Sequence, residues 1–184
     1  GIQGVDTRAI TKRIRVHGAL NACLSTEGIS AEEALSKARG WEGIVGKDFV
    51  KEVTCKECMI WDSAGENSQP FTVEGTNLAQ NQIKPKKSYR LVAFDYGAKR
   101  AIFNNLRKFG FEVIVLPADA SAADARSQNP AGIFLSNGPG DPSALNYAHE
   151  TVRDLIADYP IFGICLRKNM MTSKNDVINS DFQN

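Results

Sequence analysis

The chain has 184 residues, of which 42% are hydrophobic and 23% charged, and its formal net charge is +1. These values are typical of a soluble globular protein, and so small a charge gives no electrostatic attraction to nucleic acid or to an anionic membrane. No apolar run approaches the roughly 20 residues that a membrane-spanning helix needs. The four cysteines, at positions 23, 55, 58 and 165, are too scattered for a secreted disulfide framework, so we expect a reducing, cytoplasmic location.

The first predicted element is an amphipathic helix. It begins after Asp6, a residue type that caps helix starts, and ends at Gly18, a residue type common at helix ends. Ile10 and Ile14 lie four residues apart and therefore share one face, with basic residues around it. A short strand is expected next, over residues 19–25.

A second helix is predicted from a capping box at its start. Ser30 and Glu33 have the spacing at which each side chain bonds the other's backbone, and the helix is expected to end near Gly40. Loops and small strands are expected over residues 41–73. Together these elements predict an α+β domain over residues 1–82, and the missing initial methionine leads us to expect that its start is absent.

Residues 83–88 are polar, basic and contain proline, which is typical of a linker. Beyond it, over residues 89–166, strands alternate with helices. The strands are predicted at 90–94, 111–115, 132–135 and 161–164, and the helices at 101–108, from Ser121 onward, and at 144–158. Each strand is nearly continuous in apolar residues, which indicates an α/β domain whose parallel sheet is covered on both faces.

Two loops at the carboxyl ends of these strands are the candidate site, because ligands of such sheets bind there. The first is residues 136–142, in which Gly138 and Gly140 allow close backbone approach and could present N–H groups to an oxyanion. An ordinary strand-to-helix turn explains the same residues. The second is the turn at Cys165, where a strand end and a helix start would activate a thiolate nucleophile. A buried packing cysteine is the alternative.

Taken together, the two loops resemble a known family. Residues 134–142 (FLSNGPGDP), followed by 162–166 (FGICL), are similar to class I, triad-type glutamine amidotransferases. Residues 93–100 (AFDYGAKR) resemble the start of the glutaminase domain of carbamoyl-phosphate synthase small subunits, and residues 4–11 (GVDTRAIT) resemble that family's N-terminal domain. The resemblance implies an incomplete small-subunit domain followed by the first half of a flavodoxin-like glutaminase domain.

The resemblance also implies a reaction. Cys165 matches the nucleophile that attacks the side-chain amide of L-glutamine, releases ammonia and forms a thioester that water hydrolyses. Gly138 and Gly140 match positions that bind glutamine and the oxyanion, and the amide of Leu166 matches a second oxyanion donor. The ammonia would pass to a large-subunit partner, which uses ATP, Mg and bicarbonate to make carbamoyl phosphate for arginine and pyrimidine synthesis. No cofactor is implied for this chain itself.

The chain departs from the family after Leu166. The family continues with Gly-His-Gln, whereas residues 167–169 here are Arg-Lys-Asn, and residues 167–184 are expected to be a tail foreign to the family. The family's catalytic His and Glu come from a later segment. His17 and His149, the two histidines of the sequence, match no catalytic position, so we expect the chain to be inactive alone.

Two other roles stay open. The chain could be a docking or structural module without catalysis, or another class I amidotransferase, against which the first 80 residues argue. Zinc binding by the pair Cys55 and Cys58 is disfavoured, because neither a second such pair nor a nearby histidine pair completes a site, and no metal is expected. The sequence contains no Walker-type phosphate loop.

Overall fold

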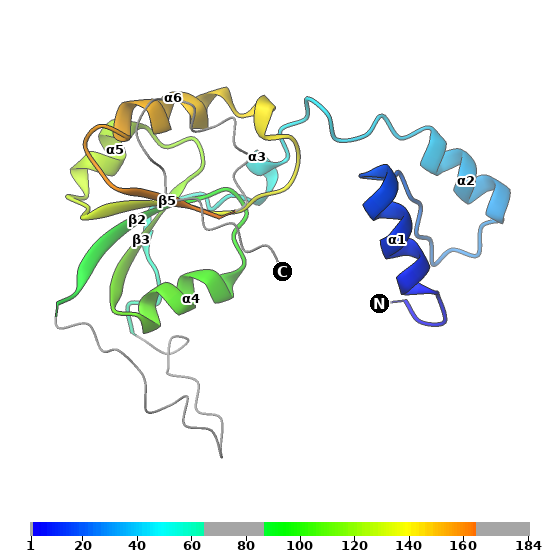
Figure 1. The fold of residues 1–184 in the computed structure, drawn as a ribbon, viewed down its shortest axis with the longest axis horizontal. Helices are drawn as coiled ribbons and strands as arrows, with labels where there is room; N and C mark the ends of the chain where they lie inside the picture. The colour runs from blue at the N-terminus through cyan, green and yellow to red at the C-terminus, as the bar shows by residue number, and fades with distance from the viewer. Residues whose placement is uncertain (1, 65–86, 165–184) are drawn as a thin grey trace, which may run out of the picture. The chain divides into compact units, whose positions relative to one another are not determined.

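The structure, a computed structural model, describes residues 2–64 and 87–164. The chain divides into two compact units, Gly1–Ile44 and Val45–Asn184. Each unit is described by itself below. Figure 1 shows the helices of the first unit, and in the second unit a sheet with helices on both faces.

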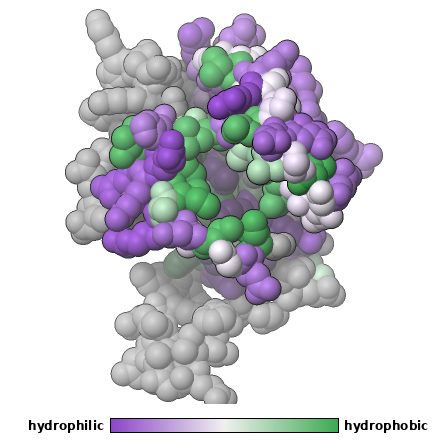
Figure 2. All heavy atoms as spheres, turned by 90° about the vertical axis from the view of Figure 1, so that its right-hand side faces the viewer, coloured by the Kyte–Doolittle hydropathy of each residue, from purple (hydrophilic) through white to green (hydrophobic). Residues whose placement is uncertain are grey.

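The first unit contains the two predicted helices. Helix α1, Thr7–His17, begins where the Asp6 carboxylate accepts a hydrogen bond from the N–H of Ala9 at 2.8 Å. Helix α2, Ala31–Arg39, begins where the Ser30 hydroxyl accepts from the N–H of Glu33 at 3.1 Å. Both helix predictions are confirmed. Neither helix has a buried residue, and Figure 2 shows apolar residues among the hydrophilic ones at the surface.

The strand predicted over residues 19–25 is wrong, because this stretch runs without regular structure. A strand needs a neighbour to bond its backbone N–H and C=O groups, and the described part of the first unit contains no strand. Leu20 and Leu24, whose apolar side chains suggested a buried strand, are 45% and 73% exposed.

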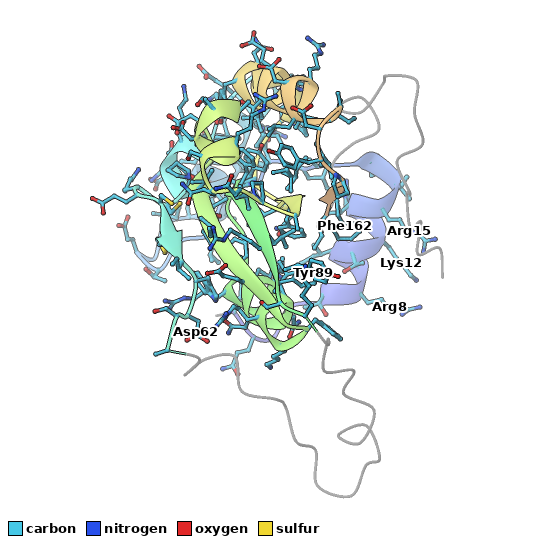
Figure 3. The ribbon with its side chains drawn as sticks, turned by 90° about the vertical axis from the view of Figure 1, so that its left-hand side faces the viewer. Arg8, Lys12, Arg15, Asp62, Tyr89 and Phe162 are labelled. Atoms are coloured by element: carbon cyan, nitrogen blue, oxygen red, sulfur yellow. The ribbon has the colours of Figure 1, made fainter. Side chains whose placement is uncertain are left out.

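The second unit is built on a five-stranded sheet with the order β1-β3-β2-β4-β5. The strands are β1 (Met59–Ile60), β2 (Tyr89–Asp95), β3 (Phe111–Pro117), β4 (Gly132–Leu135) and β5 (Ile161–Gly163). Figure 3 labels Tyr89, the first residue of β2, and Phe162 in β5. Strands β2 to β5 pair in parallel, and β1 pairs antiparallel with β3 at the edge. The predicted parallel sheet is therefore confirmed, and β1 adds an antiparallel strand to it.

Helices cover the two faces of the sheet (Figure 1). Helix α4, Arg100–Lys108, packs on one face through Phe103, which is buried with Val113 and Phe134. Helices α5, Ala122–Ser127, and α6, Asn146–Leu155, cover the other face, where α6 buries three side chains. The helix predicted from residue 144 instead starts with a short 3₁₀ turn, Pro142–Ala144, and becomes α6 at Asn146.

The division into units differs from the predicted boundary at residues 83–88. Short helix α3, Val50–Val53, buries Val50 completely in the cluster on the α5 and α6 face, and Met59 of β1 pairs with Val115. Core burial and sheet pairing thus join the residues from 45 to 64 to the sheet. Most of the predicted linker, residues 83–86, lies outside the described residues.

Candidate active site

The candidate site lies where the strand order reverses. The chain leaves the central strand β2 for β3 on one side and then crosses to β4 on the other. At such a reversal the loops that follow the two strands separate and leave room for a ligand. Here they are the loop of residues 96–98 after β2 and the predicted loop of residues 136–142 after β4, called the glycine loop below.

The end of β5 adjoins the start of the glycine loop. Gly163 pairs with Leu135 across the parallel ladder, and the N–H of Ile164 donates to the carbonyl of Leu135 at 3.0 Å. The strand ends that precede the two candidate loops thus lie side by side at the same level. Cys165 and Leu166, and the predicted tail of residues 167–184, lie outside the described residues.

Ser136 anchors the glycine loop in the core. Its side chain is 1% exposed, and its hydroxyl accepts from the N–H of Tyr96 at 2.9 Å and donates to the carbonyl of Asn137 at 2.9 Å. Its own N–H donates to the carbonyl of Phe94 at 3.2 Å. One small polar side chain therefore ties the loops after β2 and β4 together. The sequence of the loop alone indicates no role for Ser136.

Each predicted glycine has a structural reason to lack a side chain. A Cβ at Gly138 would clash with the carbonyl oxygen of Tyr96 and lie 2.9 Å from its Cβ. Gly140 has a φ of +88°, and a Cβ there would lie 3.2 Å from the carbonyl oxygen of Lys47 and 3.3 Å from the ring of Phe49. The backbone of the loop is therefore pressed against its neighbours.

The loop after β2 is organised by Asp95. One carboxylate oxygen accepts from the N–H groups of Gly97 and Ala98, at 3.0 and 2.9 Å. The other accepts from the N–H of Cys55 at 3.0 Å. Asp95 therefore joins this loop to a segment 40 residues earlier. In the sequence, Asp95 is only one residue of the family-like run 93–100, and its spacing to other residues gives no signal of this bridge.

Burial sets the protonation of the side chains around the loops. Loss of water, with the Asp95 carboxylate nearby, raises the pKa of the Cys55 thiol to about 11. Burial also raises the pKa of Tyr96 well above its ordinary value, and its hydroxyl has no hydrogen-bond partner among the described residues. Both groups are therefore neutral at physiological pH. Cys55 lies half-buried against the cluster on the α4 face, and Cys58 is exposed.

The two histidines of the sequence lie on helices and not in the candidate loops. The Nε2 atom of His149 lies 3.1 Å from the carbonyl oxygen of Pro142, and His17 is the last residue of α1 in the first unit. Residues 2–64 and 87–164 contain no group of three or more His, Cys, Asp or Glu placed to hold a metal ion. In the same ranges, no helix has the length and apolar character that crossing a membrane requires.

Comparisons with known proteins show what the chain is similar to. Residues 92–174 match the model described as glutamine amidotransferase class-I, a range that runs past residue 166, where we expected the resemblance to end. A carbamoyl phosphate synthase small chain of Syntrophotalea carbinolica is 43% identical over 171 residues, covering 93% of this chain and 43% of the relative. The small chain of Akkermansia muciniphila is 44% identical over 167 residues, covering 90% of this chain and 41% of the relative.

A plant protein extends the comparison. The chloroplastic carbamoyl phosphate synthase small chain of Arabidopsis thaliana is 38% identical over 172 residues, covering 93% of this chain and 38% of the relative. The similarity thus includes the first unit as well as the sheet. The chain spans less than half the length of these relatives.

Proposed function

Because the chain belongs to the glutamine amidotransferase class-I family, we propose that it is part of the glutaminase subunit of a carbamoyl phosphate synthase. The relatives carry that name, and the similarity covers 93% of this chain. Similarity over the first unit favours this subunit over other class I amidotransferases.

In the proposed reaction the Cys165 thiolate attacks the side-chain carbonyl carbon of L-glutamine. The C–N bond breaks, the nitrogen takes up a proton and leaves as ammonia, and a glutamyl thioester remains on the sulfur. Water then hydrolyses the thioester to glutamate. Backbone N–H groups of the glycine loop and of Leu166 would bind the negative oxygen of each tetrahedral intermediate, the interaction that contributes most in acyl transfer.

The observation that carries the proposal is the junction of β4 and β5. The hydrogen bond from Ile164 to Leu135 supports a site in which the residue before the nucleophile lies beside the start of the glycine loop. A nucleophile and an oxyanion-binding loop must both lie within about 3 Å of one reacting carbonyl. Neighbouring parallel strands that end at the same level satisfy that requirement.

The proposed partner is the large subunit of the synthase, with which the chain would form a heterodimer in the cytoplasm. That subunit would bind ATP and Mg and combine the ammonia with bicarbonate to make carbamoyl phosphate. We propose no cofactor for this chain. A role as a docking or structural module is the second candidate, favoured because the two histidines lie on helices α1 and α6 and not in the candidate loops.

The two candidates are distinguished by incubating the purified chain with L-glutamine. The glutaminase proposal predicts an intact mass increased by one glutamyl group, mapped to Cys165 and absent in Cys165→Ser. The Cys55→Ser variant is the matched control. It should retain the adduct, because the Cys55 thiol of the wild type is half-buried, has a raised pKa and is therefore a poor nucleophile. We expect no sustained ammonia release from the chain alone. An unmodified Cys165 in the wild-type chain would favour the structural role.

A further inference from the structure

We propose that residues 46–55, called the supporting segment, position the glycine loop for catalysis, with Phe49 as the main positioning residue. This inference rests on the proposed glutaminase function. The supporting segment precedes the matched family range of residues 92–174, so the family model assigns it no role. It belongs to the same compact unit as the sheet.

The first half of the supporting segment lies directly against the glycine loop. The N–H of Gly46 donates to a carboxylate oxygen of Asp141 at 3.2 Å. The Lys47 carbonyl and the Phe49 ring limit the space at Gly140, where a Cβ would come within 3.2 and 3.3 Å of them. The supporting segment thus forms a hydrogen bond with Asp141 of the loop and packs against Gly140.

The second half is fixed to the sheet. Val50 is 0% exposed and belongs to the same buried cluster as Phe94 and Tyr96. The Thr54 hydroxyl accepts from the N–H of Ala118 at 2.9 Å, and the N–H of Cys55 donates to Asp95 at 3.0 Å. Because this half is anchored in the core, the first half can hold the loop in one place.

The supporting segment also contacts the loop after β2. A Cβ at Gly97, whose φ is +110°, would lie 2.8 Å from a methyl group of Val53 and 3.0 Å from the ring of Pro139. Val53, Gly97 and Pro139 therefore meet at one point, where the two loops and the supporting segment adjoin. The glycine loop is enclosed by Tyr96 near Gly138 and by Phe49 near Gly140.

Oxyanion binding depends on donors whose positions are set before the reaction. Gly140 adopts a left-handed conformation, and glycine is the residue type with the widest choice of alternatives. Contact with Phe49 and Lys47 selects one of those alternatives. Removing the Phe49 ring should therefore loosen the loop without removing any group that touches substrate.

The primary test is hydrogen exchange of the whole chain, followed by mass spectrometry of peptides. In Phe49→Ala, we expect exchange in the peptide that covers residues 136–145 to rise by about tenfold, with peptides from β3 unchanged. Phe49→Leu should restore most of the protection, because it refills the space beside Gly140. The matched control is Phe111→Ala, which shortens a half-buried phenylalanine at the amino end of β3, away from the loops.

The second measurement compares two reagents on Cys165: a diazoketone analogue of glutamine, and iodoacetamide, which needs no oxyanion loop. Phe49→Ala should lower the labelling ratio of the first to the second by about fivefold or more, and Phe49→Leu should restore it. The Phe111→Ala variant should leave the ratio unchanged.

The two proposals fail in different ways. Unchanged loop exchange in Phe49→Ala, or a rise that is equal in every peptide, would overturn the positioning role. A wild-type chain that shows no preference for the glutamine analogue would contradict the glutaminase function. The hydrogen-exchange result would still test whether Phe49 holds the glycine loop in place.

Discussion

The hydroxyl of Ser136 accepts a hydrogen bond from the backbone N–H of Tyr96, and this bond joins the ends of two adjacent strands across the reversal point of the sheet. The bond is buried, and the same hydroxyl donates to the carbonyl of Asn137. This side chain therefore helps to set the position of the glycine loop relative to the loop after β2.

Replacing this side chain should be costly. In Ser136→Ala the N–H of Tyr96 loses its partner inside the protein, and a buried donor left unsatisfied costs about 1–3 kcal/mol. We expect the free energy of unfolding of the sheet unit to fall by that amount in urea denaturation. The control, Ser88→Ala, removes an exposed hydroxyl bonded to the carbonyl of Gly110 and should cost less than about 0.5 kcal/mol. Equal losses in the two variants would contradict the anchoring role of Ser136.

Gly46 and Gly140 have similar φ angles, so comparing their alanine variants separates the cost of backbone strain from the cost of close packing. Gly46 and Gly140 have φ values of +73° and +88°, but a Cβ at Gly46 would meet nothing within 4 Å. Gly46→Ala should therefore cost only the left-handed strain of about 1–2 kcal/mol. Gly140→Ala adds contact with Lys47 and Phe49, so we expect a further loss of about 1–3 kcal/mol, measured by the same urea titration.

The result for Gly140 depends on Phe49. In the double variant that combines Gly140→Ala with Phe49→Ala, the added methyl group has more room. The further loss of unfolding free energy caused by Gly140→Ala should therefore be smaller than in the wild-type background. Strictly additive losses in the double variant would show that the ring does not confine the loop.

The Cys55 thiol predicts a stability loss in alkali. Its pKa is about 11 in the folded chain against an ordinary 9.0, chiefly because burial disfavours the thiolate. The folded chain therefore retains a proton that the unfolded chain releases. The thiol's contribution to stability is complete below pH 9 and is lost as the pH rises toward 11.

The measurement is the urea midpoint at several pH values in this range, for the wild type and Cys55→Ala. We expect the difference between them to narrow as the pH rises, because the variant lacks the titrating thiol. At about pH 8, iodoacetamide should also modify the exposed Cys58 before Cys55. A constant difference across the range, or faster labelling of Cys55, would argue against its burial.

The two tryptophans report on the two units separately. Trp61 packs edge-on against Phe103 and donates its indole N–H to Asn104 at 2.7 Å, whereas Trp41 in the first unit is 48% exposed. In Trp41→Phe, the fluorescence of Trp61 should follow one cooperative unfolding transition. In Trp61→Phe, Trp41 should change gradually, because α1 and α2 bury no residue that would make their unfolding cooperative. Coincident transitions would contradict this expectation.

Local patterns were enough to predict most elements. The capping residues Asp6, Ser30 and Ser121 start helices in the structure, and the apolar runs of the second unit are strands. These features depend on neighbours in the sequence. The stretch over residues 19–25 shows the limit, because an apolar run becomes a strand only when another strand is available to pair with it.

The supporting segment could not be predicted for a related reason. Its function depends on contacts with residues far along the chain, such as the bond from Cys55 to Asp95 and the packing of Phe49 at Gly140. Its one helix has four residues and leaves almost no periodic signal. By contrast, parallel topology alone predicts that the glycine loop and the end of β5 lie close together.

The early position of Val50 in the chain has a consequence for synthesis. Val50 leaves the ribosome before every strand of the sheet, yet its burial requires β2, β3 and α6 to be complete. Contacts so distant in sequence form slowly, because closing the intervening loop costs entropy. The supporting segment is therefore translated first and docked late, so a nascent chain cannot assemble the site until nearly all of the sheet has emerged.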